Sequence, residues 1–434
     1  MRIREIETLR MVDSGKGWWI PCKNVKKSES AMYSTKAFQM ESGERYCLLV
    51  DASTGMPCFF PNLYVTTQIR NQSLSLSAME SALSAIGLLL IHAQERGIDL
   101  ERRFRQGELL TVSEQELIRH RVQLRLVKNE RFGKRKDKYV SPRYEYVRLT
   151  EVAYYLKWLA NELVPNSKAK SQQHAIEKMC TSILSARPIR SNDEDERLDK
   201  SLSDKQSEVL ASMFSVGAES NPFVGEGLQY RNWLIYLLLF SLGLRRGELL
   251  NIHMRDVDFS ASVLHIRRRA DSQDDNRLEQ PLVKTQARSL HLSAQLVRAI
   301  QDYVMKYRHA VPGARKHGYL FVTHKAGPTQ GKPMTLTAYK KLMKTICDSS
   351  TLLKDFSGHD LRHHWNYQFS EVMDNAEPPI SEAEQEKQRS YLMGWKEGSG
   401  TARIYNKRFI RKKSNEASLV LQKNAFKMPK GIKE

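Results

Sequence analysis

The stretch that organises this chain runs from His359 to Tyr405, and its first seven residues read HDLRHHW. It continues through LMGW at residues 392–395 and ends with RIY at residues 403–405. His359 and Arg362 stand three positions apart, so on a helix both side chains lie on one face and reach the same ligand. Tyr405 stands among arginine and lysine residues. A phenol surrounded by cations favours an anionic ligand, and phosphate is the first candidate.

The chain carries a large excess of positive charge. Its 434 residues include 69 Lys and Arg against 49 Asp and Glu, a formal net charge of +20. An excess of this size is typical of proteins with a polyanionic partner, most often nucleic acid. No run approaches the roughly 18 apolar residues that span a bilayer, and the N-terminus lacks the apolar core of a signal peptide. We therefore expect a cytoplasmic protein that does not enter a membrane.

Sequence motifs for metals and cofactors are not evident. The five cysteines are scattered, odd in number and without a CxxC pair, which predicts free thiols and neither a disulfide framework nor a zinc site. A Walker loop, a dinucleotide glycine pattern, HExxH and a carboxylate cluster are also missing. We therefore expect no cofactor and no metal.

The first half of the chain predicts a small β-containing module followed by helices. β-prone residues at Tyr46–Val50 and Phe59–Thr67 flank a turn at Asp51–Gly55, so residues 1–70 are expected to form a strand-bearing module of open function. Helical spacing then runs through residues 71–187. A basic loop interrupts these helices and is either a solvated surface or a contact to the DNA backbone. Its basic side chains are Arg131, Lys134, Arg135, Lys136 and Lys138.

A linker and a second domain follow. Residues 188–201 have the polar, acidic composition of an interdomain linker, and residues 202–413 are the second expected domain. In that domain Tyr230–Leu242 reads as an almost wholly apolar helix that stops at Gly243. Two arginines come next, and Glu248 is a candidate partner for the first of them, Arg245.

The period of the apolar residues then changes from helical to alternating. Val263–Ile266 and Ser289–Leu292 are expected to be strands, and Lys284–Arg288 lies directly before the second one. Further helices are expected at residues 294–307, 335–347, 359–373 and 382–393. The fold is therefore expected to be mainly α with a small β-sheet, a multidomain α+β architecture with a basic tail at residues 414–434.

If the chain cuts a phosphodiester without metals, it needs a protein nucleophile together with cations that hold the phosphate. Such a set is present, in chain order: Arg245, Lys284, His359, Arg362, Trp395 and Tyr405.

Five local sequences resemble the motifs of the catalytic domain of the tyrosine recombinase (phage integrase) family. In order they are GLRRGEL at residues 243–249, KTQAR at 284–288, HDLRH at 359–363, LMGW at 392–395 and IY at 404–405. The resemblance covers about Ser203–Phe409, and residues 73–184 are similar in character to the family's core-binding domain. Trp395 follows Arg362 by 33 positions, which is longer than the compact family pattern.

The resemblance implies a role for each of these side chains. Tyr405 attacks a DNA phosphodiester, forms a 3′-phosphotyrosyl link and frees a 5′-hydroxyl. The planar guanidinium groups of Arg245 and Arg362 hold the non-bridging oxygens.

The other three side chains complete the implied site. His359 assists proton transfer, and Lys284 protonates the departing 5′-oxygen. Trp395 donates one hydrogen bond from its indole N–H to the phosphate. Two of these side chains also have a structural alternative. Trp395 is otherwise a core residue, and Lys284 is otherwise a plain hairpin lysine. Arg246 and Arg288 are further expected DNA contacts.

The implied function is site-specific recombination that integrates or excises a mobile element in a prokaryotic nucleoid. The implied partners are double-stranded DNA and further copies of the chain in a homo-tetramer on paired sites, alone or with related recombinases. Separately, the cluster of Leu419, Val420 and Leu421 after a basic stretch makes the C-terminal tail a candidate for docking on a neighbouring subunit. Neither ATP nor metal is implied, because the covalent link keeps the bond energy. Two alternatives stay open: a type IB topoisomerase-like or hairpin-resolving enzyme, and a non-catalytic DNA-binding accessory protein.

Overall fold

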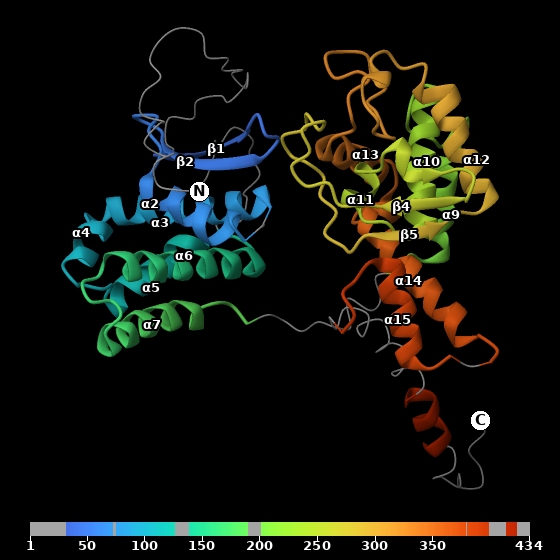
Figure 1. Ribbon diagram of the computed structural model, residues 1–434. Helices are drawn as coiled ribbons and strands as arrows, with labels where there is room; N and C mark the ends of the chain where they lie inside the picture. The colour runs from blue at the N-terminus through green and yellow to red at the C-terminus, as the bar shows by residue number, and fades with distance from the viewer. Residues whose placement is uncertain are drawn as a thin grey trace. The chain divides into compact units, whose positions relative to one another are not determined.

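The computed structural model describes residues 32–72, 75–125, 139–189, 201–378, 380–398 and 414–422. The chain divides into two compact units. The first comprises Met1–Lys36, Leu48–Gln72 and Ser81–Pro188, and the second Ala37–Cys47, Ser73–Glu80 and Ile189–Glu434. The described residues form mainly helices, with one two-stranded and one three-stranded sheet (Figure 1). This confirms the expected fold class, while the domain boundaries inferred from the sequence stay predictions.

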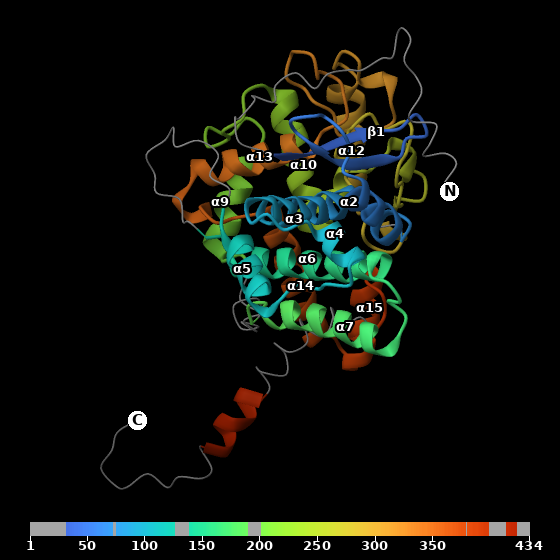
Figure 2. The ribbon, with the colours of Figure 1, turned by 90° about the vertical axis from the view of Figure 1, so that its left-hand side faces the viewer.

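The first unit is a set of helices in which α6 packs along α7 (Figures 1 and 2). On α6 the buried side chains of Leu149, Val152, Leu156 and Leu159 recur at intervals of three and four, which places them on one face. The helices are α2 (Phe59–Tyr64), η2 (Val65–Arg70, a π-helical segment), α3 (Leu76–Glu95, in this unit from Ser81), α4 (Leu100–Arg105), α5 (Val112–Gln123), α6 (Pro142–Leu163) and α7 (Lys170–Ser185).

Helix α3 is the one helix among the described residues that is long and apolar enough, by composition, to cross a membrane. Of its most apolar window, 61% is buried inside the structure. Burial of this extent is typical of the core helix of a globular domain, so its composition is weak evidence for a membrane span.

Residues Phe59–Thr67, expected to be a strand, are helical in α2 and η2, so this prediction was wrong. Phe60 and Tyr64 stand four positions apart and share one helix face. The Tyr64 ring lies 5.4 Å from both Tyr155 and Trp158, and the Phe60 ring lies 6.5 Å from Trp158. Burial of these aromatic rings against α6 outweighs their intrinsic preference for strands.

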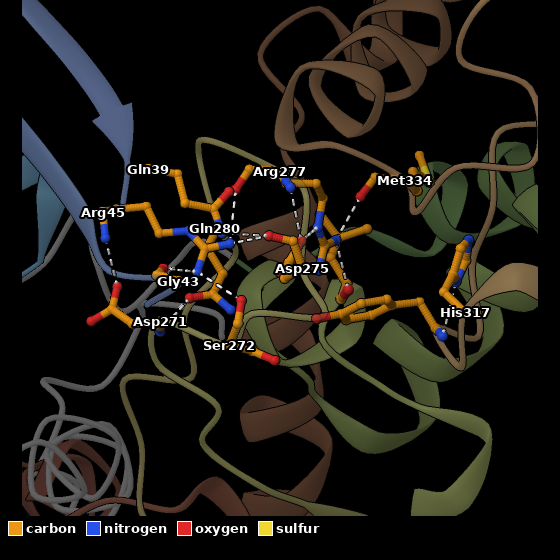
Figure 3. Close-up of polar contacts among 12 residues, drawn as sticks. Gln39, Gly43, Arg45, Asp271, Ser272, Asp275, Arg277, Gln280, His317 and Met334 are labelled. Carbon is orange, nitrogen blue, oxygen red and sulfur yellow. Dashed lines mark hydrogen bonds and ion pairs between the residues drawn. The ribbon is translucent and has the colours of Figure 1, made fainter. Parts of the chain in front are cut away.

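Strands β1 (Tyr33–Gln39) and β2 (Arg45–Asp51) form the two-stranded sheet, and the tip of this hairpin, Ala37–Cys47, belongs to the second unit. The Arg45 side chain is 1% exposed. Its guanidinium donates to the main-chain oxygens of Ser272 at 3.0 Å, Arg277 at 3.3 Å and Asp275 (Figure 3). These hydrogen bonds hold the hairpin tip against the segment between strands β4 and β5.

The second unit has a three-stranded antiparallel sheet in the order β3-β4-β5, and helix α10 contacts α14, α12 and α9 in its core. The expected strands and long helices are confirmed, with ends that differ by a few residues. The elements are α9 (Asp204–Phe214), α10 (Glu226–Leu242), α11 (Arg246–Leu250), η3 (Met254–Asp256), β3 (Val257–Asp258), β4 (Val263–Ile266), β5 (Arg288–His291), α12 (Ala294–Asp302), η4 (Tyr303–Arg308), η5 (Ala314–Lys316), α13 (Leu336–Ser349), η6 (Thr351–Leu353), α14 (Gly358–Asp374) and α15 (Glu382–Met393).

Candidate active site

The first expected site arginine follows the end of the buried helix α10. Gly243 ends this helix with φ +58°, a left-handed conformation that glycine adopts without steric cost. Arg245 then precedes the first turn of α11, and its backbone N–H donates to Glu248 Oε2 at 3.0 Å. The Arg245 side chain is partly exposed and that of Arg246 is exposed.

Arg362 lies on α14 and is 1% exposed. Its Nη1 donates to the main-chain oxygen of Gly243 at 2.6 Å, and its Nη2 to that of Met393 at 3.0 Å. Its guanidinium carbon lies 5.4 Å from the centre of the Trp395 ring. One side chain thereby brings together the segments of Arg245, Arg362 and Trp395, which are far apart in the sequence.

Glu248 is the buried carboxylate at the centre of these segments. Oε1 accepts from Thr285 Oγ1 and from Arg288 Nη1 at 3.2 Å, and Oε2 accepts from Arg288 Nη2 at 3.0 Å. Burial raises the pKa of this carboxyl, but hydrogen bonds and charge from Arg288, with Arg362 nearby, more than offset it and hold the pKa below its ordinary value. Glu248 is therefore ionised at neutral pH.

His359 lies in the first turn of α14, and its ring centre is 4.6 Å from that of His363. Although much of the side chain is accessible to solvent, protein atoms crowd the ring. This desolvation, together with His363, Arg362 and Arg245, lowers the pKa of His359 to about 4. The imidazole is therefore neutral at pH 7 and has one nitrogen that accepts a proton.

Lys284 is exposed, in a loop that contacts both neighbouring motifs. Thr285 binds Glu248, and the backbone N–H of Gln286 donates to the oxygen of Gly394 at 2.9 Å. Trp395 is 7% exposed and packs with Met393 and Trp365. The lysine loop and the tryptophan turn therefore lie side by side, but the chemical roles of Lys284 and Trp395 stay predictions.

Several expected site residues lie outside the described part of the chain. Tyr405 is one of them, so its position relative to the arginines stays a prediction. The same holds for the basic loop residues Arg131, Lys134, Arg135, Lys136 and Lys138.

Arg288 was expected to contact DNA, and in the structure it has partners within the protein. The side chain is buried, and besides Glu248 it binds the main-chain oxygen of Leu392 through Nε at 2.7 Å. DNA contact stays a prediction, but a guanidinium that faces the protein interior argues for a structural role. The sequence held a signal for this, because Arg288 alternates with the buried Leu290 and Leu292 and so lies on the inner side of its strand.

Part of the chain matches a known protein family. Residues 218–410 match the phage integrase family. This part of the chain belongs to that family. The recognition made from the five motifs is thereby confirmed, and all six expected site residues, Tyr405 included, fall within the integrase-family domain.

The chain also has curated relatives. Transposase A from transposon Tn554 of Staphylococcus aureus is 28% identical over 134 residues, 31% of this chain. The aligned region spans 34% of the relative, about a third of its length.

Two solved structures are similar to the chain as a whole. The Tn1549 transposon integrase in complex with circular intermediate DNA has 17% identity and a TM-score of 0.49, over 80% of this chain and 94% of that one. The XerH site-specific recombinase bound to difH substrate has 13% identity and a TM-score of 0.39, over 80% of this chain and 90% of that one.

Proposed function

We propose that this chain is a site-specific DNA recombinase that cuts and rejoins DNA through Tyr405. The observation that carries the proposal is the arrangement around Glu248. In a domain of the phage integrase family, Arg245 and Arg362 each approach this carboxylate to 3.9 Å, and the lysine loop contacts it through Thr285. Cations gathered at one point suit a phosphate whose charge increases in the transition state.

The reaction is a transesterification at phosphorus. The Tyr405 oxygen forms a bond to the phosphorus, the bond from phosphorus to the 5′-oxygen breaks, and the 3′ side of the DNA stays attached to the tyrosine. His359, neutral at pH 7, accepts the phenol proton, and Lys284 gives a proton to the leaving 5′-oxygen. Attack by a 5′-hydroxyl of a partner strand reverses these steps and rejoins the DNA.

Arg245 and Arg362 hold the non-bridging oxygens. Arg362 is fixed by two main-chain oxygens, of Gly243 and Met393, which reduces the orientational freedom lost when phosphate binds. Trp395, against the Arg362 guanidinium, supplies an indole N–H for the same phosphate.

The substrate we propose is double-stranded DNA at the ends of a mobile element. The named relatives, a transposase and a transposon integrase, support this choice. Strand exchange between two sites needs one nucleophile for each strand cut, so the working form is a tetramer on paired sites. The helical residues 414–422 expose Leu419, Val420 and Leu421, which suits docking on a neighbouring subunit.

The test is covalent trapping on a nicked suicide substrate taken from the element's own junction, in buffer with a metal chelator. Wild-type protein is expected to form a protein–DNA adduct, and Tyr405→Phe to bind the DNA without forming one. Tyr154→Phe is the control, because it removes the hydroxyl group of another exposed tyrosine, outside the integrase-family domain. Specific binding by wild-type protein without any adduct would instead support the accessory-protein alternative.

A second assay separates recombination from relaxation. Wild-type protein is expected to exchange strands between two cognate sites and to leave supercoiled plasmids without such sites unchanged. Efficient relaxation of those plasmids would support the topoisomerase alternative.

A further inference from the structure

The Glu248 carboxylate has all of its acceptor capacity in use. Each carboxylate oxygen offers about two lone pairs. Oε1 receives Thr285 Oγ1 and Arg288 Nη1, while Oε2 receives the backbone N–H of Arg245 and Arg288 Nη2. Four donors therefore occupy the four positions, and Arg288 supplies two of them.

The two arginines of the proposed phosphate site lie just beyond this filled carboxylate. Arg245 Nη1 is 3.9 Å from Oε1, and Arg362 Nη1 is 3.9 Å from Oε2. Both distances exceed those of direct hydrogen bonds, which end near 3.2 Å. If the positions held by Arg288 became vacant, each carboxylate oxygen would still have one of these two guanidinium groups 3.9 Å away, and attraction is strong in a buried, low-dielectric site.

Arg288 is itself firmly held. Its Nε donates to the Leu392 oxygen at 2.7 Å, and its Nη1 also donates to Thr285 Oγ1 at 3.3 Å. A Cβ at Gly394 would lie 2.6 Å from Nη1, so glycine at this position allows the guanidinium to come close. These contacts hold the Arg288 side chain on Glu248.

We propose that Arg288 is a positioning residue that occupies the Glu248 carboxylate and so leaves Arg245 and Arg362 to bind the DNA phosphate. The inference rests on the proposed function, because it names the residue that keeps the same phosphate site open. Arg288 does not touch the reacting atoms. It acts by keeping the 3.9 Å approach of each arginine to Glu248 from closing into a hydrogen-bonded ion pair.

The test compares Arg288→Met with the double variant Arg288→Met/Glu248→Gln, in single-turnover adduct formation on the suicide substrate. The single variant is expected to lose roughly 10- to 100-fold in rate, the scale seen when a supporting partner of a functional ligand is removed. The double variant is expected to recover most of this loss, because a neutral amide does not compete with phosphate for the arginines. Glu248→Gln also removes a buried charge that Arg288→Met leaves unpaired, so a purely structural role predicts that the rate follows the free energy of unfolding in both variants. Recovery of the rate beyond the recovery of stability supports the positioning role, and a rate that only follows stability overturns it.

A milder variant keeps the test decisive if Arg288→Met fails to fold. Thr285→Val removes only the hydroxyl donor on Oε1, beside Arg245, and leaves no charge unpaired. It is expected to slow adduct formation several-fold, and an unchanged rate would overturn the role of the filled carboxylate. Urea unfolding of every variant separates loss of fold from loss of rate.

The outcomes distinguish the two proposals. Failure of wild-type protein to form an adduct contradicts the proposed function. An adduct from wild-type protein together with an unchanged rate in Arg288→Met, or with no recovery in Arg288→Met/Glu248→Gln, overturns the role of Arg288 alone.

Discussion

Arg362 Nη1 donates a 2.6 Å hydrogen bond to the main-chain oxygen of Gly243, which joins the start of α14 to the end of α10. The carbonyl belongs to the left-handed residue that precedes Leu244 and Arg245. The position of one proposed phosphate-binding arginine is thereby linked to the backbone that carries the other.

Arg362→Lys should lose both stability and cleavage, although the charge is kept. One ammonium group cannot reproduce the planar fork that binds the oxygens of Gly243 and Met393. With one buried carbonyl unsatisfied, the free energy of unfolding should fall by about 1–3 kcal/mol. Urea unfolding measures this, with the exposed Arg246→Lys as control. Equal stability of the two variants would contradict the assignment.

Gly247→Ala should displace the backbone of the loop that carries Lys284. A Cβ at Gly247 would lie 2.4 Å from the main-chain oxygen of Leu282, two residues before Lys284. Because backbone must move, we expect a loss of about 1–3 kcal/mol in unfolding free energy and a slower adduct. At Gly87 in α3 the nearest atom to a Cβ is a Leu49 methyl carbon at 3.5 Å, so Gly87→Ala should be tolerated. Similar losses in both variants would contradict this reasoning.

His359 should contribute a pH dependence to stability with a definite sign. Its pKa in the folded protein is about 4, below the ordinary 6.5. Between these values the unfolded chain binds a proton that the folded protein does not, so stability falls as pH falls through this window. The stability of wild-type protein relative to His359→Gln should therefore decrease as the pH falls from 6.5 to 4. Above pH 6.5 it should stay constant. A relative increase on acidification would show that the folded protein favours the protonated ring.

The Lys284→Ala variant should be impaired in one chemical step only, the protonation of the leaving 5′-oxygen. If Lys284 protonates the leaving 5′-oxygen, a substrate with sulfur at that bridging position should bypass it, because a thiolate leaves without a proton. We expect slow adduct formation on ordinary DNA and near wild-type rates on the sulfur substrate. Arg362→Lys should stay defective on both substrates. No rescue of Lys284→Ala would assign this proton transfer to another group.

Arg45→Met should destabilise the protein, because four main-chain oxygens lose their donor, including that of Gly43 at 2.6 Å. The guanidinium binds the oxygens of Ser272, Asp275 and Arg277 in a fully buried setting. Loss of hydrogen bonds from a charged donor should cost about 2–3 kcal/mol in unfolding free energy. Lys36→Met on the same hairpin is the control, since that side chain is exposed. A loss no larger than in the control would contradict a structural role for Arg45.

The sequence predicted the second unit better than the first. Helices such as α15, expected at residues 382–393 and found at Glu382–Met393, have cap residues and spacing that act locally. The helix at Phe59–Tyr64 was missed because its aromatic residues owe their conformation to Tyr155 and Trp158, about 90 positions later. Local patterns do not contain such contacts.

The sequence likewise predicted some parts of the candidate site and missed others. The motifs identified Arg245 and Arg362, but not the oxygens of Gly243 and Met393 that hold Arg362, because main-chain partners have no residue-type signature. Arg288 was assigned to DNA from its charge and its place beside Lys284. Its pairing with Glu248, 40 positions earlier, depends on the way in which β5 packs beside α11.

The hairpin tip has a consequence for how this protein is made. Arg45 is synthesised 230 residues before Asp275, whose oxygen it binds. At about 5–20 residues per second, the ribosome needs roughly 10–50 s to cover that interval. During this time the Arg45 guanidinium has only water or provisional partners. A gene fragment that starts at residue 201 yields a second unit that never receives this arginine, so such a fragment should be less soluble than the full chain.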